Sequence, residues 1–189
     1  MSKQDAIIAA TRKWLEQAVI GLNLCPFAKS VHVKEQIRYV VSTASTEENL
    51  LDDLESELDF LVQTPPAEID TTLIVIPDLL RDFDDFLRFL DVADVVLRTH
   101  SLAGTLQIAS FHPDYVFADS DADDVANYTN RAPYPTLHLI REDSLAKATA
   151  AFPDAAEIYE RNIETMHKLG EDGWRALDVG SADPANPAE

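Results

Sequence analysis

The run TTLIVI, residues 71–76, is the feature that most restricts the fold of this chain, because it consists only of β-branched and apolar side chains. Such a run is typical of a strand that is buried on both faces of a sheet. A helical pattern precedes it over residues 45–62 and another follows over residues 82–98, with apolar side chains three and four positions apart. A buried strand between two amphipathic helices predicts a sheet covered by helices.

Three further segments have the composition of strands, and they are residues 37–42, 106–111 and 136–141. The predicted order is helix, strand, helix, strand, helix, strand, a long connection, strand and two helices. Two consecutive β-α-β units favour parallel neighbours among the first three strands, and the fourth strand could be antiparallel to the third. We therefore predict an α/β or α+β fold, with about four strands in one mixed sheet and helices packed on it.

Length, charge and cysteine content limit the class of protein. A chain of 189 residues fits one domain, predicted over residues 1–178, and the small, polar residues 179–189 predict a disordered acidic tail. The formal net charge of −19 argues against nucleic acid and anionic membrane as partners, since both require a basic surface. One cysteine allows no intrachain disulfide, and no segment approaches about 18 consecutive apolar residues. We expect a cytoplasmic protein and leave its oligomeric state open.

The connection between the third and fourth strands is long, polar and aromatic, which is typical of a binding or catalytic loop. Its sequence DSDADD matches the first ligand positions of an EF-hand. However, the sixth position is Asp124 rather than glycine, and the twelfth is Asn130 rather than glutamate. We therefore reject an EF-hand and predict a solvated acidic loop, in which Asp123 caps a short helix over residues 124–130.

Four motifs resemble the DUF1415 family of bacterial proteins. They are VIGLNLCPFAK (19–29), DTTLIVIP (70–77), QIASFHPDYVFAD (107–119) and DDVANYTNRAPYPTLHLIRE (123–142). The resemblance runs from about residue 5 to residue 177 and implies one integral domain. It implies no reaction, cofactor or catalytic residue, because the family is a domain of unknown function.

Cys25 precedes Pro26, which suits the first position of a helix, so Cys25 would be the N-cap. The positive helix end would favour a thiolate, which could act as a nucleophile or a metal ligand. The alternative is a small buried side chain in the core. His112 follows the third strand, and His138 lies inside the fourth, where a hydrogen-bonded core histidine is the alternative. If the two strands are antiparallel neighbours, both histidines could join Cys25 in a zinc or iron site.

Arg131 follows Asn130 in a proline-stiffened segment, and its planar fork suits a carboxylate or phosphate. Together with Lys29, Arg38 and Arg141 it could form a basic pocket for a small anionic molecule. The alternative is an arginine that holds the loop by pairing with a neighbouring acid. Tyr134 or His138 could orient the ligand.

Two functional hypotheses follow. In the first, the protein is a small enzyme in which Cys25 is the nucleophile, His112 the general base and Arg131 the substrate anchor. In the second, it is a non-catalytic module that binds a metabolite or metal through the loop of residues 112–141. The sequence contains no GxGxxG, GxxxxGK[ST], HExxH, CxxC or GxSxG motif, which weighs against the enzyme classes that those motifs define.

Overall fold

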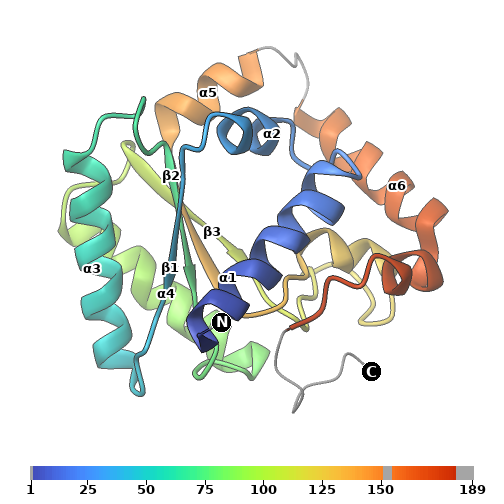
Figure 1. The fold of residues 1–189 in the computed structure, drawn as a ribbon, viewed down its shortest axis with the longest axis horizontal. Helices are drawn as coiled ribbons and strands as arrows, with labels where there is room; N and C mark the ends of the chain where they lie inside the picture. The colour runs from blue at the N-terminus through green and yellow to red at the C-terminus, as the bar shows by residue number, and fades with distance from the viewer. Residues whose placement is uncertain (1, 151–154, 182–189) are drawn as a thin grey trace.

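The computed structural model describes residues 2–150 and 155–181 (Figure 1). Its elements, in chain order, are α1 (Lys3–Trp14), the π-helical η1 (Leu15–Ile20), α2 (Pro26–Val33), β1 (Ile37–Val41), α3 (Glu47–Gln63), β2 (Thr71–Val75), α4 (Phe83–Thr99), β3 (Leu106–Phe111), the 3-10 helix η2 (Val125–Asn130), β4 (Thr136–Arg141), α5 (Glu142–Ala150) and α6 (Ala155–Ala176). The predicted fold class is confirmed, because one four-stranded mixed sheet is packed with helices.

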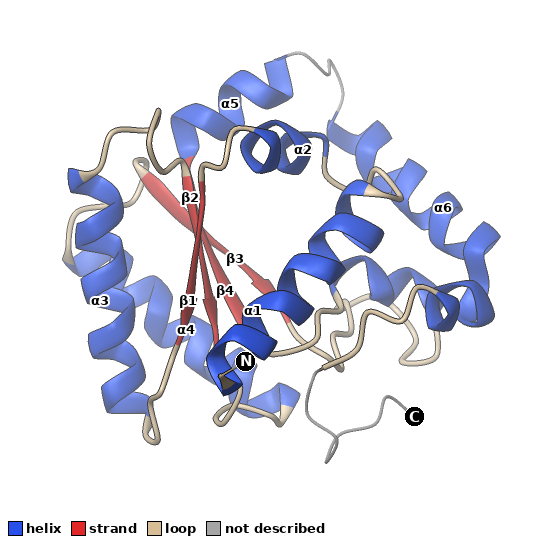
Figure 2. Cartoon of the chain, in the orientation of Figure 1, coloured by secondary structure: helices blue, strands red, loops and turns tan. Residues whose placement is uncertain are grey.

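The strand order is β1-β2-β4-β3 (Figure 2). β1 is parallel to β2, whereas β4 is antiparallel to both of its neighbours, β2 and β3. β3 runs in the same direction as β1 and β2, as expected, but the expectation that it is their neighbour is wrong, because β4 lies between β2 and β3. The long connection after β3 returns the chain as β4, which takes the place between β2 and β3. The antiparallel pairing of β3 with β4 is confirmed.

One face of the sheet is covered by α3 and α4 (Figure 1). Both helices begin at side-chain caps, since Thr46 accepts a hydrogen bond from the Asn49 N–H group and Asp82 accepts one from the Asp85 N–H group. β2 is buried along its whole length, as the run of β-branched residues predicted. The core between these layers contains Leu50, Leu54, Leu58 and Leu61 of α3, Phe86, Phe89 and Ala93 of α4, and Ile74, Leu106, Leu137 and Leu139 of the strands.

The other face of the sheet is covered by α1, η1 and α2. Trp14, at the end of α1, packs edge-on against Phe111 with ring centroids 5.0 Å apart. Its indole N–H donates to the backbone oxygen of Arg131 at 2.8 Å, which ties the first helix to the connection between β3 and β4. The side chains on this face that are only half-buried include Tyr39, Ala109 and His138.

The C-terminal helix α6 lies beside η2 rather than on the sheet (Figure 1). The rings of Tyr128 and Trp174 lie 5.5 Å apart, and His167 on α6 is 2.9 Å from the carboxylate of Asp124. Gly170 has φ of +67°, so the predicted end of a helix there appears as a kink between two helical segments. The predicted helix start at Asp154 lies outside the described residues.

The predicted tail is only partly described. Val179, the first residue of the predicted tail, is buried in the cluster around Trp14. Residues 182–189 lie outside the described part of the chain. Within residues 2–150 and 155–181, no helix combines the length and the apolar character that a membrane span requires.

Candidate functional site

The connection between β3 and β4 is held in one conformation by a buried amide. Asn127 is fully buried. Its Oδ1 accepts a hydrogen bond from the Phe117 N–H group at 3.0 Å, and its Nδ2 donates to the backbone oxygen of Asp121 at 2.8 Å. Asp124 caps η2 by accepting from the Ala126 N–H group at 2.8 Å, so the cap is Asp124 and not the predicted Asp123. One side chain thus fixes both arms of the loop, and this fixes the side chains that project from it.

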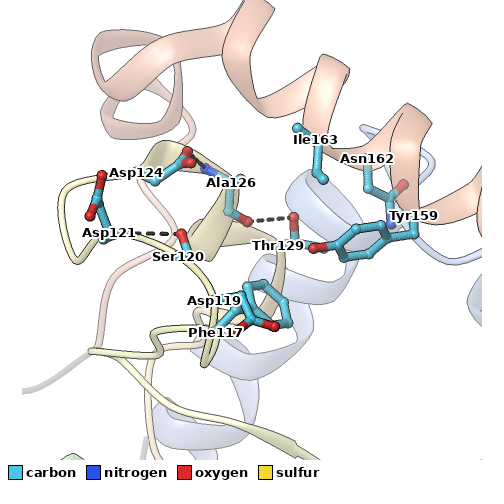
Figure 3. Close-up of a pocket in the computed structure, with 10 residues that line it drawn as sticks. All are labelled: Phe117, Asp119, Ser120, Asp121, Asp124, Ala126, Thr129, Tyr159, Asn162 and Ile163. Atoms are coloured by element: carbon cyan, nitrogen blue, oxygen red, sulfur yellow. Dashed lines mark hydrogen bonds between the residues drawn. The ribbon is translucent and has the colours of Figure 1, made fainter.

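A cavity of about 290 Å³ lies between this connection and α6 (Figure 3). The loop and η2 form one wall, and three residues on consecutive turns of α6 form the other. The side chains that line it are Phe117, Asp119, Ser120, Asp121, Asp124, Ala126, Thr129, Tyr159, Asn162 and Ile163. The cavity therefore depends on two segments that are separated in the sequence by β4 and α5.

Three aspartates line this cavity, and the charged form of one of them, Asp124, is stabilised by its neighbours. The Ala126 N–H group and then His167 hold the pKa of Asp124 below its ordinary value. Asp119 and Asp121 are exposed at the surface of the same loop, and their carboxylates make no side-chain hydrogen bond within the described chain. Three carboxyl groups therefore lie around one cavity.

Aromatic rings supply the apolar part of the cavity wall. Phe117 and Tyr159 meet edge to face with centroids 6.4 Å apart and planes at 89°. Phe117 also contacts Tyr115 at 5.0 Å, which supports its ring from behind. Tyr159 is 55% exposed, so much of its surface is open to a ligand.

The structure gives His112 a structural role. The ring is fully buried between Phe83 and Phe86, with both ring centroids 5.1 Å away. Its Nδ1 accepts a hydrogen bond from the Asp114 N–H group at 3.0 Å, so the proton lies on Nε2, which donates to the Leu80 oxygen at 3.1 Å. Burial lowers the pKa of His112. Because both nitrogens are engaged, the predicted role as base or metal ligand has no free atom to perform it.

Cys25 is the N-cap of α2 with Pro26 at the first helical position, as predicted. The expected thiolate is not favoured, because burial raises the pKa of Cys25, and the N–H groups of Ala28 and Phe27 oppose this only in part. The residue packs in the apolar clusters that join α2 to the sheet, on the face opposite His112. The thiol is thus half-buried, neutral and separated from His112 by the sheet.

The predicted three-ligand metal site is not formed. His138 pairs across the sheet with Ala109 and Leu73 and lies on the α1 and α2 face, whereas His112 faces α4. Side chains on one strand alternate between the two faces of the sheet. Ala109 lies opposite His138 and shares its face, so His112, three positions after Ala109, lies on the other face. In residues 2–150 and 155–181, no group of three histidine, cysteine or acidic side chains has the arrangement of a metal site.

The residues around Arg131 hold the connection together. The guanidinium lies 4.1 Å over the ring of Tyr128, and Nε and Nη2 approach the backbone oxygens of Tyr115 and Ala122 at 3.4 and 3.5 Å. The Asn130 side-chain amide donates to the backbone oxygen of Ser110 at 3.3 Å, and the backbone oxygen of Asn130 accepts from the backbone N–H group of His112. Tyr134 is buried with Ile7 and Val75. The predicted orienting tyrosine thus belongs to the core.

The predicted basic pocket is also not formed. Nη2 of Arg141 lies 2.5 Å from the Leu61 oxygen and 2.6 Å from the Thr64 oxygen, at the end of α3. These carbonyls have no partner within the helix, so a cation that donates to them caps it. Lys29 is exposed on α2, where it makes no hydrogen bond or ion pair within the described chain. Arg38 on β1 forms an ion pair with Glu57 of α3. Arg131, Arg141, Arg38 and Lys29 therefore belong to separate environments.

The sequence interpretation missed the contribution of α6. It used Ile163 only as a core position of that helix and assigned no role to Tyr159 or Asn162. The available signal was an aromatic residue on the polar side of an amphipathic helix. That signal does not indicate which segment the helix contacts, so the cavity could be found only from the fold.

The fold and the cavity define a single-sheet α/β protein with a small pocket under its C-terminal helix. The family model described as "Protein of unknown function (DUF1415)" matches residues 6–176, and the chain belongs to this family. Comparison with curated proteins and with solved structures gave no match.

Proposed function

We propose that this protein is a binding module that holds a small molecule between the β3–β4 connection and α6. The observation that carries the proposal is the cavity of about 290 Å³, whose loop wall is fixed by the buried Asn127. Its volume is at the lower end of the range of small-ligand pockets, which is roughly 300–1,000 Å³. A wall that is already ordered reduces the conformational entropy that a ligand must overcome.

The placement of the reactive side chains supports binding rather than catalysis. Cys25 and His112 pack on opposite faces of the sheet, and burial raises the pKa of the Cys25 thiol. A nucleophile and its base must come within hydrogen-bond reach of each other. The enzyme hypothesis and the cytoplasmic location both stay predictions.

Blocking the cavity tests the proposal. Ser120→Trp places an indole at a lining position, and Ser56→Trp on the exposed surface of α3 is the matched control. Saturation-transfer NMR with a mixture of small metabolites should give signals for wild type and for Ser56→Trp that disappear with Ser120→Trp. Equal melting temperatures of the two variants would show that both are folded. If wild type binds no compound, or if Ser120→Trp binds the same compounds equally well, the cavity is not a binding site.

A further inference from the structure

The middle of the sheet is covered less completely on the α1 and α2 face than on the α3 and α4 face. Leu137 and Leu139 of β4 point toward α3 and α4, and both are fully buried. His138 lies between them in the chain, points to the opposite face and is only half-buried. Because β4 has a strand on each side, it has no open edge. The accessible surface of His138 therefore lies above the sheet, between the strand and the helices.

The positions of α1 and α2 explain this accessible surface. Ile7 of α1 packs with Val75 at one end of the strands, and Phe27 of α2 packs with Ile140 at the other end. Figure 2 shows the two helices over different ends of the sheet. His138 lies in the row of residues between these two clusters. Each helix thus buries its own end of the sheet and leaves the row of His138 less covered.

The side chains beside His138 leave space and form an apolar wall. Its cross-strand neighbour on β3 is Ala109, which is half-buried and has only a methyl group to place beside the imidazole. The ring of Phe111, on the same face, has its centroid 6.1 Å from that of the imidazole. Cys25, at the start of α2, packs against the same apolar cluster as Ala109. The surroundings of the imidazole on this side are therefore apolar and partly aromatic.

His138 presents one unpaired acceptor atom to this space. The Thr71 hydroxyl donates to the Leu139 oxygen at 2.6 Å, so Nε2 of His138 donates to that hydroxyl at 2.7 Å and Nδ1 has the lone pair. Nδ1 makes no hydrogen bond within residues 2–150 and 155–181. It also retains accessible surface, since it is not among the buried polar atoms that lack a partner in the described chain. A ligand with a polar hydrogen can therefore reach it.

From this geometry we infer that the space beside His138 binds a small neutral aromatic molecule with a polar hydrogen, of which phenol is the simplest example. The O–H or N–H group of the ligand donates to Nδ1, and its ring packs against Phe111 and the methyl group of Ala109. Burial alone, with no contribution from a charged neighbour, lowers the pKa of His138 to about 4. A charged ligand would therefore lose its hydration without gaining a partner of opposite charge. None of these residues lines the cavity under α6, so the inference does not depend on the proposed function.

Three probes test the inference on the full chain. Phenol has the required donor, fluorobenzene has nearly the same shape without a donor, and benzoate has a charge. With isotope-labelled histidine, NMR at neutral pH should show the resonance of the unprotonated Nδ1 of His138 shifting as phenol is added, and much less with fluorobenzene. Phenol should bind at least about fivefold more tightly than fluorobenzene, because it adds one hydrogen bond, and benzoate should not bind.

Variants locate the site. His138→Phe keeps a planar ring, removes the lone pair and identifies the Nδ1 resonance by its loss, and it should bind phenol and fluorobenzene equally. Ala109→Leu fills the space and should weaken both probes by at least about tenfold. Ala103→Leu, on the exposed turn before β3, is its matched control and should bind both as wild type does. Thermal melts of all three variants show that they are folded.

The outcomes decide between this site and the cavity under α6. Ser120→Trp, which blocks that cavity, should leave phenol binding unchanged, and loss of binding in this variant would overturn the inference while supporting the proposed function. Equal affinities of phenol and fluorobenzene for wild type, an unshifted Nδ1 resonance or no phenol binding at all would also overturn it. If Ala109→Leu does not fold, the comparison of wild type with His138→Phe still decides the question.

Discussion

Acid should destabilise this fold through His138, whose neutral form the structure favours. The Thr71 hydroxyl donates to the Leu139 oxygen at 2.6 Å, so it can only accept from Nε2–H of His138, 2.7 Å away. Protonation must then occur on Nδ1, next to Leu73 and Ala109, which are its cross-strand neighbours. Within residues 2–150 and 155–181 no opposite charge faces this nitrogen, and burial lowers the pKa of His138 to about 4.

The size and the pH window of the effect follow from that pKa. The unfolded chain binds the proton near pH 6.5, whereas the folded chain binds it only near pH 4. The stability is therefore complete above about pH 6.5 and falls as the pH decreases toward 4. At about 1.4 kcal/mol for each pH unit, the full loss is roughly 3.4 kcal/mol. Because the ring is only half-buried, we expect about 2–3 kcal/mol in practice.

Urea denaturation followed by circular dichroism can isolate the contribution of His138 to the unfolding free energy. His138→Gln keeps a donor at the position of Nε2 and does not titrate, so it retains the bond to Thr71. The difference in unfolding free energy between wild type and variant should change by about 2–3 kcal/mol between about pH 7.5 and pH 4, in favour of the variant in acid. Other groups titrate in both proteins and cancel. A difference that stays constant over this range would refute the reasoning.

Three other predictions can be tested with the same protein. Arg141→Ala should lower the unfolding free energy by about 2–4 kcal/mol in urea denaturation, because it leaves the carbonyls at the end of α3 unpaired, whereas Arg98→Ala, an exposed residue of α4, should change it by less than about 0.5 kcal/mol. Asn127→Ala should lower it by about 2–3 kcal/mol, and an unchanged value would show that the amide does not fix the loop. Cys25 should react slowly with iodoacetamide until about pH 9 by mass spectrometry, because its pKa is raised, and rapid labelling at neutral pH would contradict this.

The elements of this fold were predictable because they depend on local sequence. β3 and β4 have the predicted bounds, and Thr46 is one of the two predicted caps of α3. The strand order was not predictable, since it depends on where the chain returns after the long connection. β4 pairs with both β2 and β3, and β-α-β rules for consecutive strands do not include such an insertion.

The alternation of side chains contained more information than the sequence interpretation used. Alternation along each strand places His112 on the same face as Leu106 and Ile108, and His138 on the same face as Thr136 and Ile140. Combining it with the antiparallel register would have placed the two histidines on opposite faces. By contrast, the pKa of Cys25 depends on which side chains bury it. The N-cap position of Cys25 follows from Pro26, but the desolvation of its thiol follows from packing between α2 and the sheet.

The environments of Arg131 and Arg141 show why residue types alone can mislead. Arg131 and Arg141 indicated an anionic ligand, because a guanidinium binds carboxylate and phosphate through its planar fork. The same fork can bind backbone oxygens, and here both arginines approach carbonyls at loop and helix ends. An arginine therefore indicates an anion site only when the backbone around it has no unpaired carbonyls. In this chain the charged side chains that line the cavity between the β3–β4 connection and α6 are the carboxylates of Asp119, Asp121 and Asp124.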